Sequence, residues 1–239
     1  FNWITKKKGV YREDPITLKR LVYSIYAFTG FLIGTTITTF YGHILFLFRK
    51  STVKKKLRLH RTLMSISRFV VTRIPGVKFS FNNISGETFD KPSIIICNHQ
   101  SHIDLMCIMM LTPKMIILTN DWAWNNIFYG RLIKYADFYP VSQGIEKHIA
   151  QLKAKVDEGY SLMIFPEGTR SADCHIQRFH HGAFYLAQQL HLDIVPVFIH
   201  GNGHVLPKND FMLREGKIHV EDRERITTND SRFYSDYSI

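Results

Sequence analysis

Residues 93–109 read SIIICNHQSHIDLMCIM. The first part, residues 93–97, is apolar and rich in β-branched side chains, which is typical of a strand buried on both faces. A short polar stretch follows, and the apolar residues within 102–111 then predict a buried helix. A buried strand that leads through a polar turn into a helix indicates an α/β protein.

Strand-like and helix-like segments alternate along the rest of the chain. We expect strands at residues 78–81, 93–97, 115–118, 138–141, 161–165, 194–199 and 217–220, and helices at residues 102–111, 122–135, 145–158 and 181–190. This alternation predicts an α/β fold with a mixed, largely parallel sheet flanked by helices. In such sheets ligands bind beyond the carboxyl ends of the strands, where loops lead into helices.

A long uncharged segment precedes this domain. Residues 21–48 contain no Lys, Arg, Asp or Glu, and about 20 apolar residues are enough for a helix to cross a bilayer core. Glycines and threonines interrupt the run between Gly34 and Thr39. The segment therefore predicts either one membrane span or two shorter helices, broken in this stretch, that lie in one leaflet. Basic residues flank both ends, and this lack of a positive-inside asymmetry favours the two-helix arrangement.

The net charge of +11 is concentrated near the N-terminus. Residues 1–77 hold fifteen Lys and Arg against two acidic residues, whereas the remainder holds sixteen basic and eighteen acidic residues. A basic surface attracts nucleic acid or anionic lipid, and the apolar run inside it favours lipid and argues against nucleic acid. Residues 50–73 fit either a helix on anionic lipid or a core helix. We therefore expect a basic membrane-anchoring helical region, residues 1–75, and an α/β domain, residues 76–239.

The cysteines indicate the compartment. Cys97 and Cys107 lie in apolar runs, and neither they nor Cys174 form a Cys-x-x-Cys pair, so reduced thiols are expected. This predicts a membrane-associated protein whose α/β domain lies on the cytoplasmic face of the inner or cell membrane. The chain begins with Phe1 rather than Met, which leaves room for a fused or partner domain before residue 1.

The first candidate site directly follows the strand at residues 93–97. His99 is expected at the strand end and Asp104 in the first turn of the next helix, with Asn98 or Ser101 as its N-cap. A carboxylate placed there can fix one imidazole nitrogen and leave the other free as a general base. The alternative is that Asp104 only complements the helix dipole and that His99 is an ordinary loop residue.

The second candidate site follows the strand at residues 161–165, in the sequence FPEGTRS at residues 165–171. Gly168 would let the backbone approach a ligand closely. The Arg170 guanidinium matches two phosphate oxygens, and Glu167 would accept from a hydroxyl or hold Arg170 in place. Alone, the same pattern also fits a turn with a surface ion pair. The twelve histidines show no metal-ligand spacing, so no metal site is predicted.

Together the two motifs resemble those of the 1-acyl-glycerol-3-phosphate acyltransferase family, the lysophosphatidic acid acyltransferases. Residues 98–104 match the family's Asn-His-x-Ser-x-x-Asp signature, and residues 165–171 match Phe-Pro-Glu-Gly-Thr-Arg-Ser at every position. Residues 179–187 and 194–197 also look like later segments of the family. The likeness extends over residues 78–201.

The resemblance implies transfer of a fatty acyl group from an acyl carrier protein or coenzyme A thioester to the free hydroxyl of a lysophospholipid. Lysophosphatidic acid, giving phosphatidic acid, is the acceptor that it implies first. His99 would remove the hydroxyl proton and Asp104 would orient His99. The substrate-binding residues would be Glu167, Gly168, Thr169, Arg170 and Ser171. The thioester is a co-substrate, and no further cofactor is expected.

One departure leaves the acceptor open. Family members usually carry an Arg shortly after a Pro-Val pair between the two motifs, whereas residues 139–144 here read YPVSQG. Arg170 is then the one motif-matched cation, with Arg131, Lys134 and Arg178 as candidate helpers. The alternatives are the same chemistry on a different lipid acceptor, a non-catalytic membrane lipid-binding module, or a hydrolase that uses Ser101 as its nucleophile.

Overall fold

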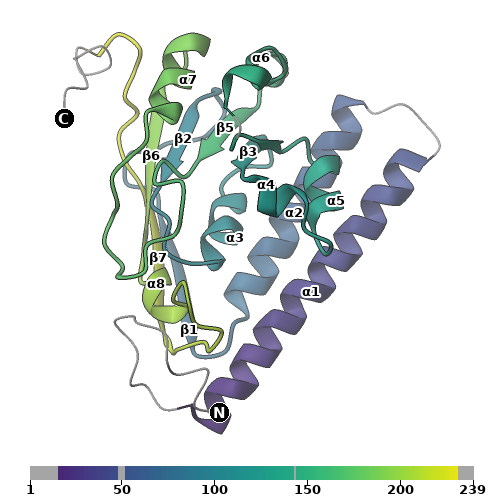
Figure 1. The fold of residues 1–239 in the computed structure, drawn as a ribbon, viewed down its shortest axis with the longest axis vertical. Helices are drawn as coiled ribbons and strands as arrows, with labels where there is room; N and C mark the ends of the chain where they lie inside the picture. The colour runs from purple at the N-terminus through teal and green to yellow at the C-terminus, as the bar shows by residue number, and fades with distance from the viewer. Residues whose placement is uncertain (1–15, 48–51, 143, 231–239) are drawn as a thin grey trace.

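A mixed β-sheet forms the centre of the protein (Figure 1). The structure is a computed structural model that describes residues 16–47, 52–142 and 144–230. Within these residues the sheet has seven strands in the order β1-β7-β6-β2-β5-β3-β4. The strands are β1 (Val77–Asn82), β2 (Ile94–Cys97), β3 (Met115–Thr119), β4 (Tyr139–Pro140), β5 (Ser161–Ile164), β6 (Ile194–His200) and β7 (Gly216–Asp222). Neighbouring strands run parallel except for β6 and β7, which are antiparallel.

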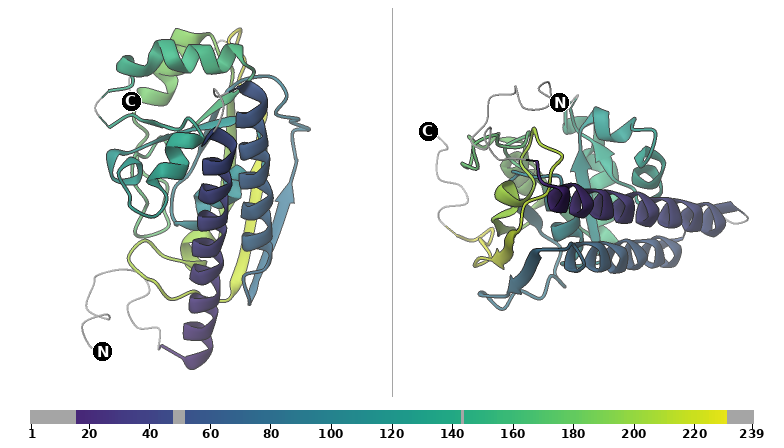
Figure 2. Two further views of the ribbon diagram at one scale, coloured as in Figure 1. Left: turned by 90° about the vertical axis from the view of Figure 1, so that its right-hand side faces the viewer. Right: turned by 90° about the horizontal axis from the view of Figure 1, so that it is seen from below.

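Helices cover both faces of the sheet. They are α1 (Leu18–Leu47), α2 (Val53–Thr72), α3 (Ile103–Met109), α4 (Asp121–Trp124), α5 (Gly130–Tyr135), the 3-10 helix η1 (Glu146–His148), α6 (Ile149–Asp157), α7 (Gly182–Leu190) and α8 (Asn202–Val205). Residues of α2, α3 and α5 pack on one face, and residues of α6 and α7 pack on the other. Helix α1 lies beside α2 and α5 on the outside of the first layer (Figure 2).

The central strand β2 shows why the chain folds as layers. Ile94 and Ile96 enter the core beneath α6 and α7, whereas Ile95 and Cys97 enter the core beneath α2 and α3. All four residues are buried, as the apolar run predicts, and full burial of each large apolar side chain contributes about 1.5–3 kcal/mol. The predicted α/β class with a largely parallel sheet is confirmed. Burial raises the pKa of the Cys97 thiol well above its usual range.

The helix predicted at residues 122–135 is wrong, because the structure divides this stretch into α4 and α5. The side chain of Asn120 caps α4 by accepting from the Ala123 N–H at 2.9 Å. Asn126 then turns the chain, since its Oδ1 accepts from the Phe128 N–H at 2.9 Å. At the start of α5, a Cβ on Gly130 would lie 2.6 Å from the Trp124 carbonyl oxygen, so the turn requires glycine.

Two other segments are shorter than predicted. The helix expected from residue 145 begins as η1, and its α-helical part is α6. The strand expected at residues 138–141 is reduced to Tyr139 and Pro140, because proline has no N–H to donate to a sheet.

Helix α1 is continuous, so the predicted break between Gly34 and Thr39 is wrong. The hydroxyls of Thr36, Thr38 and Thr39 each donate to the carbonyl four residues earlier, at 2.7–2.8 Å. The threonines therefore satisfy their polar groups within the helix instead of ending it. The second helix of this region is α2.

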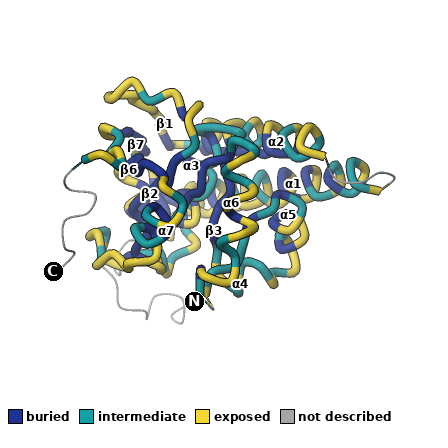
Figure 3. Tube along the Cα trace, turned by 90° about the horizontal axis from the view of Figure 1, so that it is seen from above, coloured by how far each residue is buried: buried dark blue, intermediate teal, exposed yellow. Residues whose placement is uncertain are grey.

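On a water-soluble domain, a helix turns its apolar side to the core and its polar side to solvent. Helix α1 has the reverse arrangement. Its buried residues are Ser24, Gly34, Thr35, Thr38 and Gly42. Its exposed large apolar residues include Leu18, Val22, Ile25, Tyr26, Ile33, Ile37, Phe40, Ile44 and Leu47. Figure 3 shows buried, intermediate and exposed positions alternating along α1. By length and composition α1 is also a candidate membrane span. Small residues inside and large apolar residues outside are suited to a helix that faces lipid.

Small residues allow α1 to approach its neighbours closely. A Cβ added at Gly34 would lie 2.7 Å from Cγ2 of Ile66 in α2. A Cβ added at Gly42 would lie 2.9 Å from the ring of Tyr135 in α5. The helix pair therefore depends on these two glycines for its spacing.

The change Gly34→Leu is expected to lower the free energy of unfolding by about 1–3 kcal/mol, because the added side chain overpacks the contact with Ile66. Thermal unfolding in detergent micelles measures the effect. Gly30→Leu is the matched control, since a Cβ at Gly30 meets nothing within 4 Å and the gain in helix propensity is the same. Equal stability of the two variants would contradict the packing described here.

Candidate active site

The two sequence motifs meet because their strands are neighbours. Strands β2 and β5 are parallel, with Ile96 opposite Ile164. Three positions further on, His99 and Glu167 also lie next to each other. The backbone N–H of His99 donates to Oε1 of Glu167 at 2.6 Å. The backbone N–H of Ser171 donates to the carbonyl of His99 at 2.7 Å. The loops after β2 and β5 thus form one site at the carboxyl edge of the sheet.

The side chain of His99 is held by Asp104. Its Nδ1 lies 2.9 Å from Oδ2 of Asp104, which occupies the first turn of α3 as predicted. The imidazole stacks on the ring of Phe165, with 3.9 Å between centroids and 14° between planes. Its Nε2 has no hydrogen-bond partner among the residues that the structure describes. One nitrogen is therefore fixed while the other is available to a substrate hydroxyl.

Asp104 is fully buried, and the protein satisfies its charge with hydrogen bonds. Oδ2 also accepts from the backbone N–H groups of Gln100 and Ser101, at 2.7 and 2.8 Å. Oδ1 accepts from Nδ2 of Asn202 in α8, at 2.5 Å. These hydrogen bonds fix the position of the carboxylate, and so they also fix the orientation of the imidazole that it contacts. Sequence analysis identified neither Asn202 nor α8.

Asn98 and Ser101 have different roles from those predicted. The Asn98 amide accepts from the N–H of Ile199 and donates to its carbonyl, at 2.8 and 3.0 Å, and so joins β2 to β6 instead of capping α3. The buried Ser101 hydroxyl donates to the Leu206 carbonyl at 2.8 Å and accepts from the Ile103 N–H at 3.3 Å. Ser101 is thus a structural residue at the start of the helix.

Glu167 connects two loops and does not hold Arg170. Its side chain is 2% exposed, and its second carboxylate oxygen accepts from the Gln177 N–H at 2.9 Å. Ser171 is also buried, and its hydroxyl donates to Asp173 at 2.7 Å. The predicted interaction of Glu167 with Arg170 is therefore wrong, because the buried carboxylate satisfies two backbone N–H groups.

The part of the turn that faces solvent is made of Gly168, Thr169 and Arg170. Gly168 has a φ of 67°, in the left-handed region that favours glycine. Nη1 of Arg170 donates to the carbonyl of Lys208 at 3.1 Å, and burial lowers the pKa of the guanidinium. Nζ of Lys208 in turn lies 3.2 Å from Oγ1 of Thr169. The turn therefore presents a half-buried cation and a second cation that sequence analysis missed.

Of the helper cations proposed from the sequence, Arg131 and Lys134 contact other residues, and Arg178 is exposed at the surface. The Arg131 guanidinium lies 3.3 Å from Nε2 of His43 in α1. The Lys134 ammonium lies 5.3 Å from the centre of the Trp124 ring. Arg178 is exposed, and Gln143, which lies in the segment without the expected Arg, is outside the described residues.

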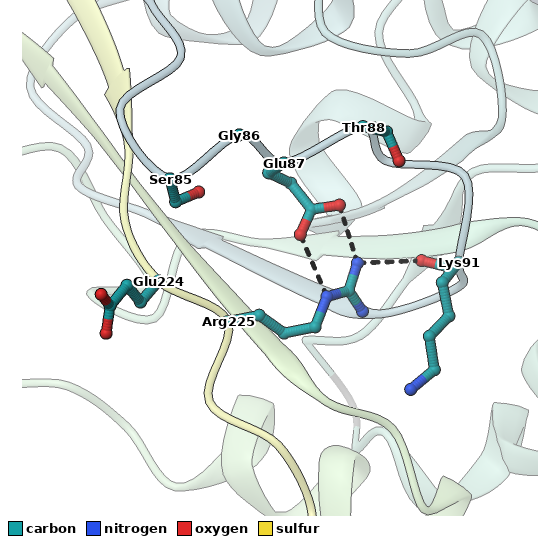
Figure 4. A pocket seen from close by; sticks show the side chains of 7 residues that line it. All are labelled: Ser85, Gly86, Glu87, Thr88, Lys91, Glu224 and Arg225. Carbon is teal, nitrogen blue, oxygen red and sulfur yellow. Dashed lines mark hydrogen bonds and ion pairs between the residues drawn. The ribbon is translucent and has the colours of Figure 1, made fainter.

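A separate pocket lies near the amino end of β2 and the carboxyl end of β7, at the edge of the sheet opposite to His99 (Figure 4). Arg225 in this pocket donates two hydrogen bonds to Glu87 and one to the Lys91 carbonyl. Its charge is therefore neutralised within the fold. In the described part of the chain, no group of three or more His, Cys, Asp or Glu side chains is arranged to hold a metal ion.

Comparisons with known proteins identify the family of the chain. Residues 77–200 match the family model described as Acyltransferase. A 1-acyl-sn-glycerol-3-phosphate acyltransferase from Cocos nucifera is 34% identical over 155 residues, which cover 62% of this chain and 50% of the relative. A protein of the same name from Limnanthes alba is 31% identical over 147 residues, which cover 59% and 52%. The chain spans about half the length of these curated relatives.

The fold also has a counterpart among solved structures. The crystal structure of the 1-acyl-sn-glycerophosphate acyltransferase PlsC from Thermotoga maritima superposes with a TM-score of 0.74. The match covers 92% of this chain and 90% of that one, at 21% sequence identity. This likeness includes the helical region as well as the sheet, because it extends over nearly the whole chain.

The change Glu167→Gln is expected to lower the free energy of unfolding by about 1–3 kcal/mol. The amide nitrogen cannot accept, so one of the two buried backbone N–H groups is left without a partner. Chemical denaturation of the two proteins measures the difference. Glu224→Gln, at an exposed position, serves as the control, and equal losses in both variants would contradict the proposed connection.

Proposed function

This chain belongs to the acyltransferase family, and we propose that it transfers a fatty acyl group from a thioester to the free hydroxyl of a lysophospholipid. The observation that carries the proposal is the contact between His99 and Asp104, which leaves Nε2 of His99 free beside the turn at residues 167–171. The names of the curated relatives support lysophosphatidic acid as the acceptor and phosphatidic acid as the product.

His99 acts as a general base in this proposal. Nε2 removes the proton of the acceptor hydroxyl while the oxygen attacks the thioester carbonyl, forming a C–O bond and a tetrahedral intermediate. The intermediate expels the thiolate by breaking the C–S bond, and the imidazolium returns the proton to the sulfur. Asp104 stabilises the imidazolium between these two steps and contributes orientation. Coenzyme A and acyl carrier protein both present such a thioester and are the proposed donors.

Direct transfer is preferred over an acyl-enzyme. The Ser101 hydroxyl is buried and already donates to the Leu206 carbonyl, so it is not presented to a thioester. His99 is also placed by its contact with Asp104 and not by a serine hydroxyl. The hydrolase alternative therefore lacks an accessible nucleophile at this position.

The turn after β5 is proposed to hold the acceptor phosphate. Arg170 supplies the charge, while Gly168 and Thr169 expose backbone and hydroxyl groups beside it. Glu167 and Ser171 contribute indirectly, because their hydrogen bonds hold the turn against the loop that carries His99. A different lipid acceptor remains the alternative, since residues 139–144 contain no Arg.

We further propose that α1 lies within one leaflet, with the α/β domain on the cytoplasmic side. Both ends of α1 contact that domain: Nε of Arg20 donates to the Leu213 carbonyl at 3.3 Å, and His43 bonds to the Tyr135 hydroxyl. A helix that crossed the bilayer would carry one of these contacts to the opposite side. The exposed apolar face of α1 is then available to lipid tails along its length.

Helix α4 and its connection to α5 extend this apolar surface. Trp122, Ile127 and Phe128 are 64%, 89% and 67% exposed. Tyr129, next to them, contacts the ring of Phe31 in α1, with 6.4 Å between centroids. Three exposed apolar side chains beside a lipid-facing helix are suited to insertion at the membrane surface.

His99→Ala is expected to lower the rate of acyl transfer by about 10²–10⁴-fold, because the general base is lost. The assay uses detergent-solubilised protein, a labelled long-chain acyl-coenzyme A or acyl carrier protein thioester, and a panel of lysolipids. The variant His204→Ala, at an exposed position, controls for the loss of a histidine outside the dyad. Undiminished turnover by His99→Ala would refute the mechanism, and absence of transfer by the wild-type protein to every acceptor would favour the lipid-binding module.

Replacing Trp122, Ile127 and Phe128 with serine is expected to reduce binding to anionic vesicles several-fold, because each substitution removes apolar area from the lipid contact. Vesicle co-sedimentation of the detergent-free protein measures binding. Serine at Phe81 and Ile84, which are 41% and 54% exposed on the other side of the domain, is the matched control. Unchanged binding by the triple variant would contradict insertion of this connection.

A further inference from the structure

We propose that Lys208 is a second cation of the acceptor site, which together with Arg170 binds the phosphate group of the acceptor. The inference rests on the proposed function and assigns a specificity-determining role to a residue outside both sequence motifs. Two hydrogen bonds join Lys208 to the turn that carries Arg170. Arg170 donates to the Lys208 carbonyl at 3.1 Å, and the Lys208 ammonium donates to the Thr169 hydroxyl at 3.2 Å.

Neither cation has a carboxylate partner among the described residues. Asp210, two positions after Lys208, is bonded to Arg214 at 2.8 Å, and Asp173 accepts from the Ser171 hydroxyl. Other partly buried cations of the protein do have carboxylate partners, as in the pairs Lys56–Asp137 and Arg225–Glu87. An anion that reaches both the Arg170 guanidinium and the Lys208 ammonium would supply the hydrogen-bond acceptor that a carboxylate provides in those pairs, and such charge-assisted hydrogen bonds are strong.

The pair lies beside the catalytic dyad. Arg170 follows β5, whose neighbour β2 leads to His99, and the loop after β5 bonds to the His99 backbone. The charge of Arg170 also acts on His102, where it adds to burial in lowering the pKa to about 4. In a glycerol phosphate the free hydroxyl and the phosphate can occupy neighbouring carbons. A general base and a phosphate-binding site that act on such a molecule must therefore be adjacent. His99 and Arg170 meet this requirement, because the loops that carry them are hydrogen-bonded to each other.

The segment that carries Lys208 is held in place by Asp104 and by the neighbouring Ser101. Asn202 in α8 donates to Asp104 at 2.5 Å, and the Leu206 carbonyl accepts from Ser101 at 2.8 Å. Lys208 comes two residues after the second contact. Its ammonium has three donors, and the single bond to a neutral hydroxyl leaves the other two for phosphate oxygens.

The test is binding of a short-chain lysophosphatidic acid, below its micelle concentration, to the wild-type protein and to Lys208→Gln by calorimetry. We expect the Kd to rise about 10-fold or more in Lys208→Gln, since a charge-assisted hydrogen bond is lost. Lys208→Arg should retain binding within a few-fold, because it keeps the charge. Lys78→Gln, on an exposed strand position away from the site, should bind like the wild type.

The kinetics of acyl transfer then distinguish a loss of phosphate recognition in Lys208→Gln from a loss of loop stability. In Lys208→Gln the KM for lysophosphatidic acid should rise about 10-fold while kcat changes less than threefold, and the KM for a matched monoacylglycerol without phosphate should not change. Equal binding by the wild type and Lys208→Gln, or equal losses with both acceptors, would overturn the inference. Phosphate-dependent binding through Lys208 without acyl transfer by the wild type would sustain the inference and refute the proposed function instead.

Discussion

The buried carboxylate of Asp104 is the constraint on which the rest of the site depends. A carboxylate without contact to water must receive hydrogen bonds from the protein, and the four that it receives come from two parts of the fold. Three come from the turn between β2 and α3, through the His99 imidazole and two backbone N–H groups, and the fourth comes from the amide of Asn202 in α8. The base is therefore oriented by the same bonds that hold the layers together.

The pairing of β2 with β5 places the turn at residues 167–171 next to His99. Ile96 lies opposite Ile164, so the loops that follow the two strands emerge side by side and are joined through Glu167. Helix α1, whose outer face is apolar, contacts the same domain at Arg20 and at His43. The proposed acyl transfer would suit this arrangement, because the tail of a lipid substrate could stay in the bilayer while its head reacts.

The sequence was sufficient for the features that depend on local pattern. The apolar run at residues 93–97 predicted β2, and the spacing of His99 and Asp104 predicted their contact across a strand-to-helix turn. Contacts between distant residues were not predictable in this way. Asn202 lies 98 positions from Asp104, and the Lys208 carbonyl lies 38 positions from Arg170. No local pattern links such residues, because tertiary folding alone brings them together.

The errors in the sequence-based prediction have the same origin. Glycine and threonine in α1 suggested a break, yet close packing on Ile66 and hydroxyl bonds to the preceding turn keep the helix continuous. Glu167 looked like a partner for Arg170 because the two are close in sequence, but the register of β2 and β5 turns its carboxylate toward His99. In both cases a neighbour from another element determined the outcome.

The central claim is that Asp104 holds His99 with a proton on Nδ1 and a free Nε2. Nitrogen-15 NMR of histidine-labelled protein at pH 8, with His99 assigned by its loss in His99→Ala, tests this most directly. The account predicts a protonated, pyrrole-like shift for Nδ1 and an unprotonated, pyridine-like shift for Nε2, with this preference lost in Asp104→Ala. A protonated Nε2 in the wild-type protein would contradict it, because that nitrogen could not then remove a proton from the acceptor.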